Sequence, residues 1–113
     1  MQSNKNTLTK ILSFYYDFTE METNLLIYLA RNGAKTVNEL AKELGFSAPL
    51  INRYLDRLYE KGFIKRIKDT TDRSGRPRYV YMAASLAELR QRLIAEIRQT
   101  NEDMIELIEK EFI

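Results

Sequence analysis

Residues 36–63 have the sequence TVNELAKELGFSAPLINRYLDRLYEKGF, and residues 64–82 continue with IKRIKDTTDRSGRPRYVYM. The first stretch contains two short helix patterns joined by a turn at Gly45. The second has two strand-like runs around a loop rich in Ser, Gly and Pro, with arginines throughout. A helix with small and polar side chains beside a basic hairpin is a typical arrangement for reading a DNA groove and binding its phosphates. The sequence therefore predicts a nucleic-acid-binding element in the middle of the chain.

The helix starts can be located from capping patterns. A Ser or Thr followed three residues later by Glu can satisfy two unpaired backbone N–H groups at a helix start. Ser47 precedes a further start at Pro49, since proline is tolerated in the first turn. The capping pattern occurs three times, at Thr19 and Glu22, Thr36 and Glu39, and Ser85 and Glu88. Together with an apolar stripe near the N-terminus, the expected helices cover residues 7–18, 19–32, 36–44, 48–61 and 86–112.

After Gly62 the apolar period falls to two. Residues 63–67 and 78–82 are rich in β-branched and aromatic side chains and are predicted to be strands, with a loop at 70–77 between them. The predicted fold class is therefore mainly α with a small β-hairpin. A chain of 113 residues supports one hydrophobic core. We expect residues 1–113 to form one domain with its core at 19–82.

The composition argues against an enzyme. The chain contains no Cys and no His, so it lacks a thiolate nucleophile, the commonest general base and the commonest metal ligands. Carboxylate pairs such as Glu39 and Glu43 lie on expected caps or solvent faces, without a nucleophile motif or phosphate loop. We expect no catalytic residue, no bound metal and no cofactor.

The sequence gives no sign of secretion or membrane insertion. The first residues, MQSNKNTLTK, lack the apolar run of a secretion signal. No stretch approaches the roughly 18 consecutive apolar residues of a membrane span. These features predict a cytoplasmic protein without a membrane partner.

The positive charge is concentrated in the middle of the chain. The net charge of +2 says little by itself. Residues 34–82, however, hold eleven basic and six acidic side chains, whereas residues 83–113 hold four basic and seven acidic ones. Because phosphate attracts the former segment and repels the latter, contact with nucleic acid is expected only in the middle.

The expected helix 48–61 has a solvent face suited to the major groove. With Ile51, Leu55 and Leu58 directed inward, its N-terminal half presents polar side chains outward. Asn52 there can bond adenine, and Arg53 can bond two acceptors of guanine. The alternative is that these are ordinary solvated residues. The residues expected to contact DNA from this helix are Ser47, Pro49, Leu50, Asn52, Arg53 and Arg57.

The predicted hairpin adds a second basic element. Arginines surround Gly75 and Pro77 at its tip, and a guanidinium there can enter a minor groove or bind phosphate. The alternative is a solvated turn. The residues expected to contact DNA from this wing are Lys65, Arg66, Lys68, Arg73, Ser74, Arg76 and Arg78.

The two terminal helices carry apolar stripes that exceed what the small core can cover. On the C-terminal helix the stripe repeats in steps of three and four and is interrupted around Thr100 and Asn101. We expect both helices to pair across a two-fold axis, the alternative being that they pack on each other within one chain. The expected dimerisation residues are Leu8, Ile11, Leu12, Tyr15, Leu89, Leu93, Ile97, Asn101, Met104 and Ile108.

The order of these motifs resembles the winged helix-turn-helix regulators of the TrmB and MarR type. A T-x-x-E helix start at Thr19, a T-x-x-E-L-A helix from Thr36 and the ending L-x-x-K-G-F-I from Leu58 follow one another as in the TrmB-like group. The resemblance implies a DNA-binding, usually dimeric transcription factor. Full-length TrmB regulators also carry a C-terminal sugar-binding domain, so this chain is expected to be a minimal relative without sugar binding.

Three functions remain open at this stage. The first is a regulator that binds a short palindromic site in double-stranded DNA as a homodimer. The second is a sequence-tolerant architectural protein that uses the same basic surface. The third is a winged helix that serves as a protein interaction module. The sequence leaves the operator, activation or repression, and any small-molecule effector unknown.

Overall fold

The structure, a computed structural model, describes residues 4–69 and 78–113. The described residues are mainly helical with one small antiparallel sheet, which confirms the predicted fold class. The elements are α1 (Asn4–Tyr16), α2 (Glu20–Asn32), β1 (Lys35–Thr36), α3 (Val37–Leu44), α4 (Ala48–Glu60), β2 (Ile64–Asp69), β3 (Arg78–Ala83) and α5 (Leu86–Glu111).

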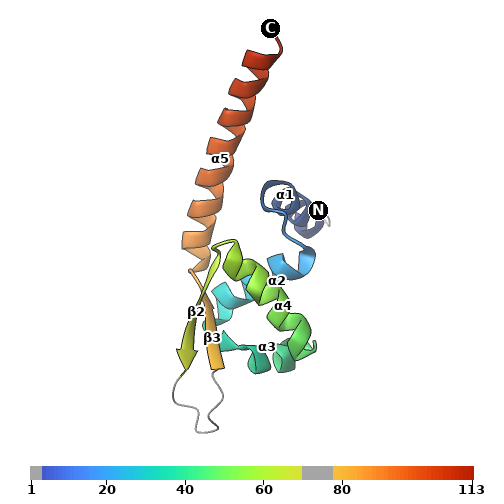
Figure 1. The fold of residues 1–113 in the computed structure, drawn as a ribbon, viewed down its shortest axis with the longest axis vertical. Coiled ribbons are helices and arrows are strands. Elements are labelled where there is room, and N and C mark those ends of the chain that lie inside the picture. Colours follow the sequence, from blue (N-terminus) through green and yellow to red (C-terminus); the bar gives the residue numbers. More distant parts are fainter. Residues whose placement is uncertain (1–3, 70–77) are drawn as a thin grey trace.

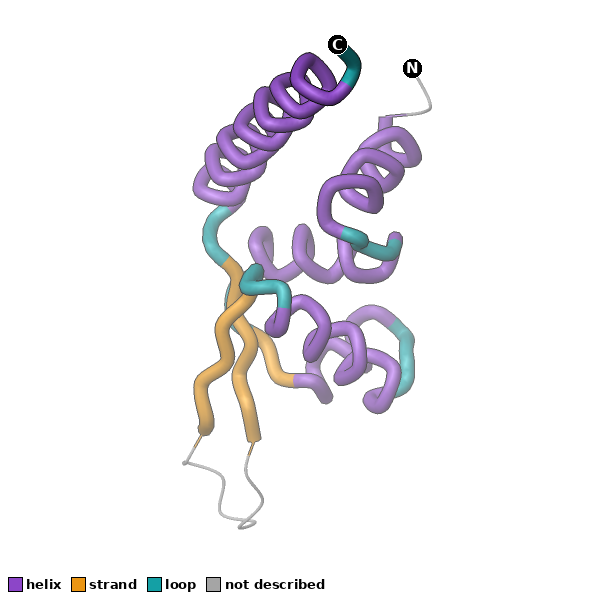
Figure 2. Tube along the Cα trace, turned by 45° about the horizontal axis from the view of Figure 1, so that its top comes forward, coloured by secondary structure: helices purple, strands orange, loops and turns teal. Residues whose placement is uncertain are grey.

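The elements form a compact centre with projections at both ends. Helices α2, α3 and α4 pack together beside the sheet (Figure 1). Helices α1 and α5 extend toward one end of the molecule, and the β2–β3 hairpin extends toward the other (Figure 2). The longest dimension is consequently 64 Å, against 32 and 25 Å in the other two directions.

Helix α5 is the longest element, with 26 residues. At 1.5 Å per residue its length is about 39 Å. Leu89, near its start, is buried in the core, whereas Ile108 near its end is 57% exposed. Within the described part of the chain, neither α5 nor another helix is long and apolar enough to cross a membrane.

The sheet has three strands rather than the two of the predicted hairpin. Its order is β1-β3-β2, and both pairings are antiparallel. The short strand β1 places Lys35 opposite Tyr81 and Thr36 opposite Val80. Two residues are too few to show the alternation of apolar and polar side chains that marks a strand, so β1 could not be recognised from the sequence. It forms because β3 lies beside it. Strand β1 fixes the start of α3 against the wing.

The helix ends follow their capping residues closely. At α3, the Thr36 side chain accepts from the Glu39 N–H (3.1 Å) while Glu39 Oε1 accepts from the Thr36 N–H (3.0 Å), so this capping box is complete. Ser85 accepts from the Glu88 N–H at 3.2 Å at the start of α5. Gly45 after α3 has φ of 75°, a left-handed conformation that glycine adopts without strain. Local hydrogen bonding therefore sets most helix boundaries.

Glu22 is an exception to the capping prediction. Its N–H donates to the Thr19 side chain at 3.1 Å, but its carboxylate is fully buried and faces α4. Glu22 Oε1 lies 2.8 Å from Arg57 Nε, and Glu22 Oε2 lies 2.8 Å from Lys61 Nζ. Lys61 also donates to the Asp17 carbonyl at 2.7 Å. One carboxylate thus binds both basic residues near the end of α4.

The hydrophobic core is shared by all five helices and the sheet. Leu25 and Leu29 of α2, Leu40 of α3 and Ile51 of α4 are at most 1% exposed. Phe18 and Phe63 meet edge-to-face with 4.9 Å between ring centroids, joining the α1–α2 turn to the start of the wing. This core holds α4 and the hairpin in fixed relation.

Glu22→Gln is expected to lower the free energy of unfolding by about 2 kcal/mol. The amide leaves Arg57 and Lys61 without a buried counter-charge, and the loss of one partner of a buried ion pair is strongly destabilising. Their partial exposure lets water compensate in part. Urea denaturation measures the effect. Glu20→Gln, at an exposed position on the same turn, should change stability by only a few tenths of a kcal/mol; equal effects of both variants would contradict the buried role of Glu22.

Candidate nucleic-acid interface

Helix α4 begins with a cap suited to an exposed helix start. Ser47 has extended backbone angles, and its hydroxyl accepts from the Leu50 N–H at 3.4 Å. Pro49 occupies the first turn, where its missing N–H leaves no hydrogen bond unmade. The remaining N–H groups of this turn point out of the helix end. The predicted contact residues Ser47 and Pro49 are both exposed there.

The two sides of α4 differ sharply in burial. Ile51, Leu55 and Leu58 are fully buried, as their spacing predicts. Asn52 and Arg53 are exposed on the solvent side, and Leu50 is half-buried. The Arg53 guanidinium lies 5.7 Å from the centroid of the Tyr54 ring and pairs with no carboxylate among the described residues. The N-terminal half of α4 thus presents one amide and one guanidinium to solvent.

Arg57, a predicted DNA contact, is held by a residue of α2. It lies one turn after Arg53, but its Nε is 2.8 Å from the buried Glu22. A guanidinium held by a buried carboxylate loses that charge partner if it turns to a phosphate or base. The sequence could not show this, because Glu22 was expected to complete a helix cap. We therefore leave Arg57 out of the contact surface proposed below.

Arg66 on β2 links the wing to α4. Its guanidinium lies over the Tyr59 ring at 4.2 Å and near the Tyr79 ring at 4.9 Å. Asp56 of α4 is 3.8 Å from Arg66 Nη1. A cation between two aromatic faces and beside a carboxylate is well satisfied without an external anion. Arg66 accordingly has a structural role at the base of the wing.

The basic residues of the hairpin do not share one face. Neighbouring strand residues alternate between faces, so Lys65 lies opposite to Arg66 and Lys68. In the antiparallel register, Arg66 is paired with Tyr81 and Lys68 with Tyr79. Lys65 and Lys68 are both exposed. The other predicted wing residues Arg73, Ser74 and Arg76 lie outside the described residues.

A shallow hollow joins α4 to the wing. It has a volume of about 180 Å³ and lies between the start of α3, the exposed side of α4 and strand β3. Asn38, Tyr79 and Arg78 line it together with Asn52. Neither Asn38 nor Tyr79 is among the residues predicted from the sequence to contact DNA, although an outward polar residue in the first turn of α3 was a usable signal. Residues from three elements therefore face one space.

The predicted dimerisation residues fall into different environments. Leu12 and Leu89 are 4% and 5% exposed within the chain's own core, so their assignment to an interface between copies is wrong. The Tyr15 hydroxyl donates to Asn101 Oδ1 within the same chain. Leu8 and Ile11 remain 40% exposed. The rest lie on α5, where Leu93, Ile97 and Met104 are half-buried and Ile108 is exposed.

Glu43 is an acidic residue that makes structural contacts. No group of three or more carboxylates within residues 4–69 and 78–113 is arranged to hold a metal ion. Glu43 of α3 accepts from the Tyr28 hydroxyl at 2.6 Å and lies 3.2 Å from Lys35 Nζ. The hydrogen bond from Tyr28, followed by that from Lys35, lowers the pKa of Glu43. This cluster connects α2 and α3 to β1.

Known structures share this fold. A possible transcriptional regulator from Methanosarcina mazei Go1 aligns with a TM-score of 0.76 and 21% identity over 92% of this chain and 87% of that chain. MarR from E. coli in its apo form aligns with a TM-score of 0.62 and 21% identity over 96% and 76%. Streptococcus pneumoniae FabT, in complex with DNA, aligns with a TM-score of 0.58 and 20% identity over 94% and 74%.

The sequence comparisons identify the family. No curated protein matches the sequence. The family model described as the sugar-specific transcriptional regulator TrmB matches residues 12–87. This span contains α2, α3, α4 and the whole sheet. Because the match covers more than half of the 113 residues, the chain belongs to the TrmB family of transcriptional regulators.

Proposed function

We propose that the protein is a transcription regulator that binds double-stranded DNA sequence-specifically as a homodimer in the cytoplasm. The observation that carries the proposal is the solvent side of α4, where Asn52 and Arg53 stand exposed beside the hollow that α4 shares with β3. A major groove admits one α-helix, and its base edges bond amides and guanidinium groups. Membership of a regulator family and a similar fold in a solved DNA complex support the same function.

The proposed contacts divide between α4 and the wing. Leu50, Asn52 and Arg53 of α4 contact base edges, and Ser47 with the adjoining N–H groups binds a phosphate. Each good bidentate pair contributes about 1 to 3 kcal/mol of discrimination. From the wing, the exposed Lys68 binds the flanking phosphates. Arg66 is left out of the proposed contacts because its guanidinium already contacts the Tyr59 ring and Asp56.

The alternatives make different demands on this surface. An architectural protein needs phosphate contacts but no base contacts, so scrambling the site would leave its affinity unchanged. A protein interaction module needs neither phosphate contacts nor base contacts. The exposure of Asn52 and Arg53 on the side of α4 that shares a hollow with the wing favours the specific regulator. Selection from random duplexes at physiological salt tests the choice: one enriched palindrome supports the regulator, and no enrichment rejects it.

Arg53→Ala is expected to reduce discrimination between the selected duplex and a scrambled one by about 1 to 3 kcal/mol, roughly 5-fold to 150-fold. The truncated side chain no longer bonds base acceptors. Fluorescence anisotropy titrations with both duplexes measure the ratio. Arg98→Ala removes the same charge from an exposed site on α5 and serves as the control. Identical ratios for Arg53→Ala and wild type would reject the base contact.

Lys68→Ala is expected to weaken binding to every duplex equally. Loss of one phosphate contact should also reduce the slope of log K against log salt by about 1. Titrations over a range of salt concentrations measure this slope. Lys110→Ala, on an exposed lysine paired with Glu106 at 2.9 Å on α5, is the matched control. An unchanged slope for Lys68→Ala would remove this lysine from the contact surface.

The homodimer is proposed from the part of α5 that extends beyond the core. Ile105, Leu107 and Ile108 are 56%, 59% and 57% exposed, and Phe112 is 83% exposed. A contiguous apolar strip of this kind on a long helix is typical of an interface. The α4 helices of the two copies, about 34 Å apart, would then enter successive major grooves of a palindromic site. The proposed interface consists of Leu8 and Ile11 of α1 and Met104 and Ile108 of α5, with the exposed side chains around them.

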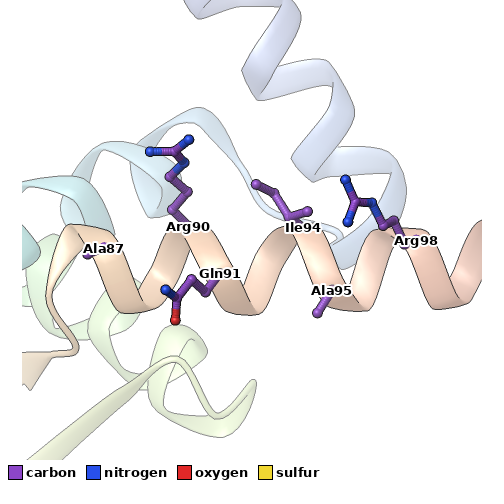
Figure 3. A pocket seen from close by; sticks show the side chains of 6 residues that line it. All are labelled: Ala87, Arg90, Gln91, Ile94, Ala95 and Arg98. Carbon is purple, nitrogen blue, oxygen red and sulfur yellow. The ribbon is translucent and has the colours of Figure 1, made fainter.

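Ile108→Glu is expected to shift the protein from dimer to monomer in sedimentation at micromolar concentration. The side chain is largely exposed in the single chain, so folding should be unaffected while the charge is buried at the interface. Gln91→Glu is the control, because it adds the same charge at an exposed position of α5 more than four turns before Ile108. Gln91 lies with Ala87, Arg90, Ile94, Ala95 and Arg98 around a hollow made by α5 alone (Figure 3). A wild-type monomer would refute the dimer.

A further inference from the structure

A single tight turn joins α4 to the wing. Helix α4 ends at Glu60, Lys61 follows it, and Gly62 has φ of 80° before β2 begins at Ile64. The Gly62 N–H donates to the Tyr59 carbonyl and the Phe63 N–H to the Leu58 carbonyl, both at 3.0 Å. The geometry of this turn therefore sets the angle between α4 and the hairpin.

Arg92 of α5 contacts this turn. Its Nη1 donates to the Gly62 carbonyl at 2.8 Å, and its Cζ lies 3.9 Å from the centroid of the Phe63 ring. Its Nε donates to Glu96 Oε2 at 3.0 Å, one turn along α5. The guanidinium thus makes two directed hydrogen bonds and one stacking contact, which fix its plane.

Glu96 extends this contact to α1. The Tyr16 hydroxyl donates to Glu96 Oε1 at 2.8 Å. Burial, followed by the bond to Glu96, raises the pKa of Tyr16 to about 12, so the hydroxyl stays a donor at neutral pH. The Tyr16 ring also meets the Phe63 ring edge-on at 5.1 Å. Side chains of α1 and α5 therefore converge on the α4–β2 turn.

Lys61, at the start of this turn, is held by different partners. Lys61 binds the buried Glu22 at 2.8 Å and the Asp17 carbonyl at 2.7 Å. Its ammonium also lies 5.1 Å from the Phe18 ring centroid. These contacts come from α2 and the α1–α2 turn. Lys61 is thus held by α2 and the α1–α2 turn, whereas Gly62 and Phe63 are contacted from α5.

We propose that Arg92 is a positioning residue for DNA recognition. Through it, the position of the terminal helices α1 and α5 determines the orientation of α4 and the wing. The inference rests on the proposed function and deepens it. Arg92, on α5, contacts the turn after the C-terminal end of α4, whereas Asn52 and Arg53 lie near the N-terminal end of α4. In this proposal Arg92 itself contacts no base. It sets the angle at which those side chains and the wing meet one duplex.

This role predicts a loss of discrimination rather than a uniform loss of binding. Base contacts require close geometry, whereas phosphate attraction tolerates a tilted domain. Lysine has one ammonium in place of the planar fork and cannot make both directed bonds with the same geometry. Arg92→Lys should therefore keep the charge and most of the stability, yet discriminate between the selected and scrambled duplexes less well than the wild type.

The test compares Arg92→Met with Arg90→Met in the full chain. Both variants remove one positive charge from α5, but Arg90 is exposed and projects from the face shown in Figure 3. Affinities for the selected and scrambled duplexes are measured well below each variant's Tm. Hydrogen exchange at the Gly62 and Phe63 amides reports the turn without DNA, and sedimentation reports the dimer.

Arg92→Met is expected to lower the ratio of specific to scrambled affinity about tenfold and to speed exchange at both amides, whereas Arg90→Met changes neither. Tyr16→Phe, which removes one hydroxyl and no charge, should move both readouts in the same direction by less. It also tests the inference if Arg92→Met does not fold.

Two results would overturn the inference while leaving the proposed function intact. The first is a wild-type ratio in Arg92→Met, or in Tyr16→Phe if Arg92→Met is unfolded. The second is an equal loss of discrimination in Arg90→Met and Arg92→Met, which would assign the effect to net charge. A wild-type protein that does not distinguish the two duplexes would overturn the proposed function itself, and the role of Arg92 with it.

Discussion

The orientation of α4 depends on the buried carboxylate of Glu22. Charge buried without a partner is costly, so this side chain requires cations from its surroundings. The two cations are Arg57 of α4 and Lys61, which directly follows α4. Together with the buried side chains of Leu55 and Leu58, the ion pairs hold α4 in one rotation about its axis. With that rotation set, Arg53 stands on the solvent side.

Much of the fold could be predicted because local chemistry determines it. The helix starts at Thr36, Ser47 and Ser85 satisfy backbone N–H groups within three residues, so the signal lies inside the segment itself. The inward positions of α4 repeat at helical spacing for the same reason. Strand β1 has no such local signal. It exists only because β3 presents an unpaired edge beside it.

The site was predicted less completely because charged side chains find partners far away in the sequence. Arg57 forms an ion pair with a residue 35 positions earlier, and Arg66 lies over rings of α4 and β3. Leu12 and Leu89 continue apolar stripes that are otherwise half-buried or exposed, yet the core covers both. Periodicity identifies a face of a helix, but the partner that covers each part of it is a property of the assembled chain.

Four arginines show how position decides the role of one residue type. Arg57 pairs with a buried carboxylate, Arg66 lies between aromatic rings, and Arg92 bonds a carbonyl and a glutamate. Each of these guanidinium groups joins two elements of the fold. Arg53 differs because it lies near the free start of α4 and pairs with no carboxylate among the described residues. Arg53 therefore stands on a helix whose backbone three paired guanidinium groups help to hold in place.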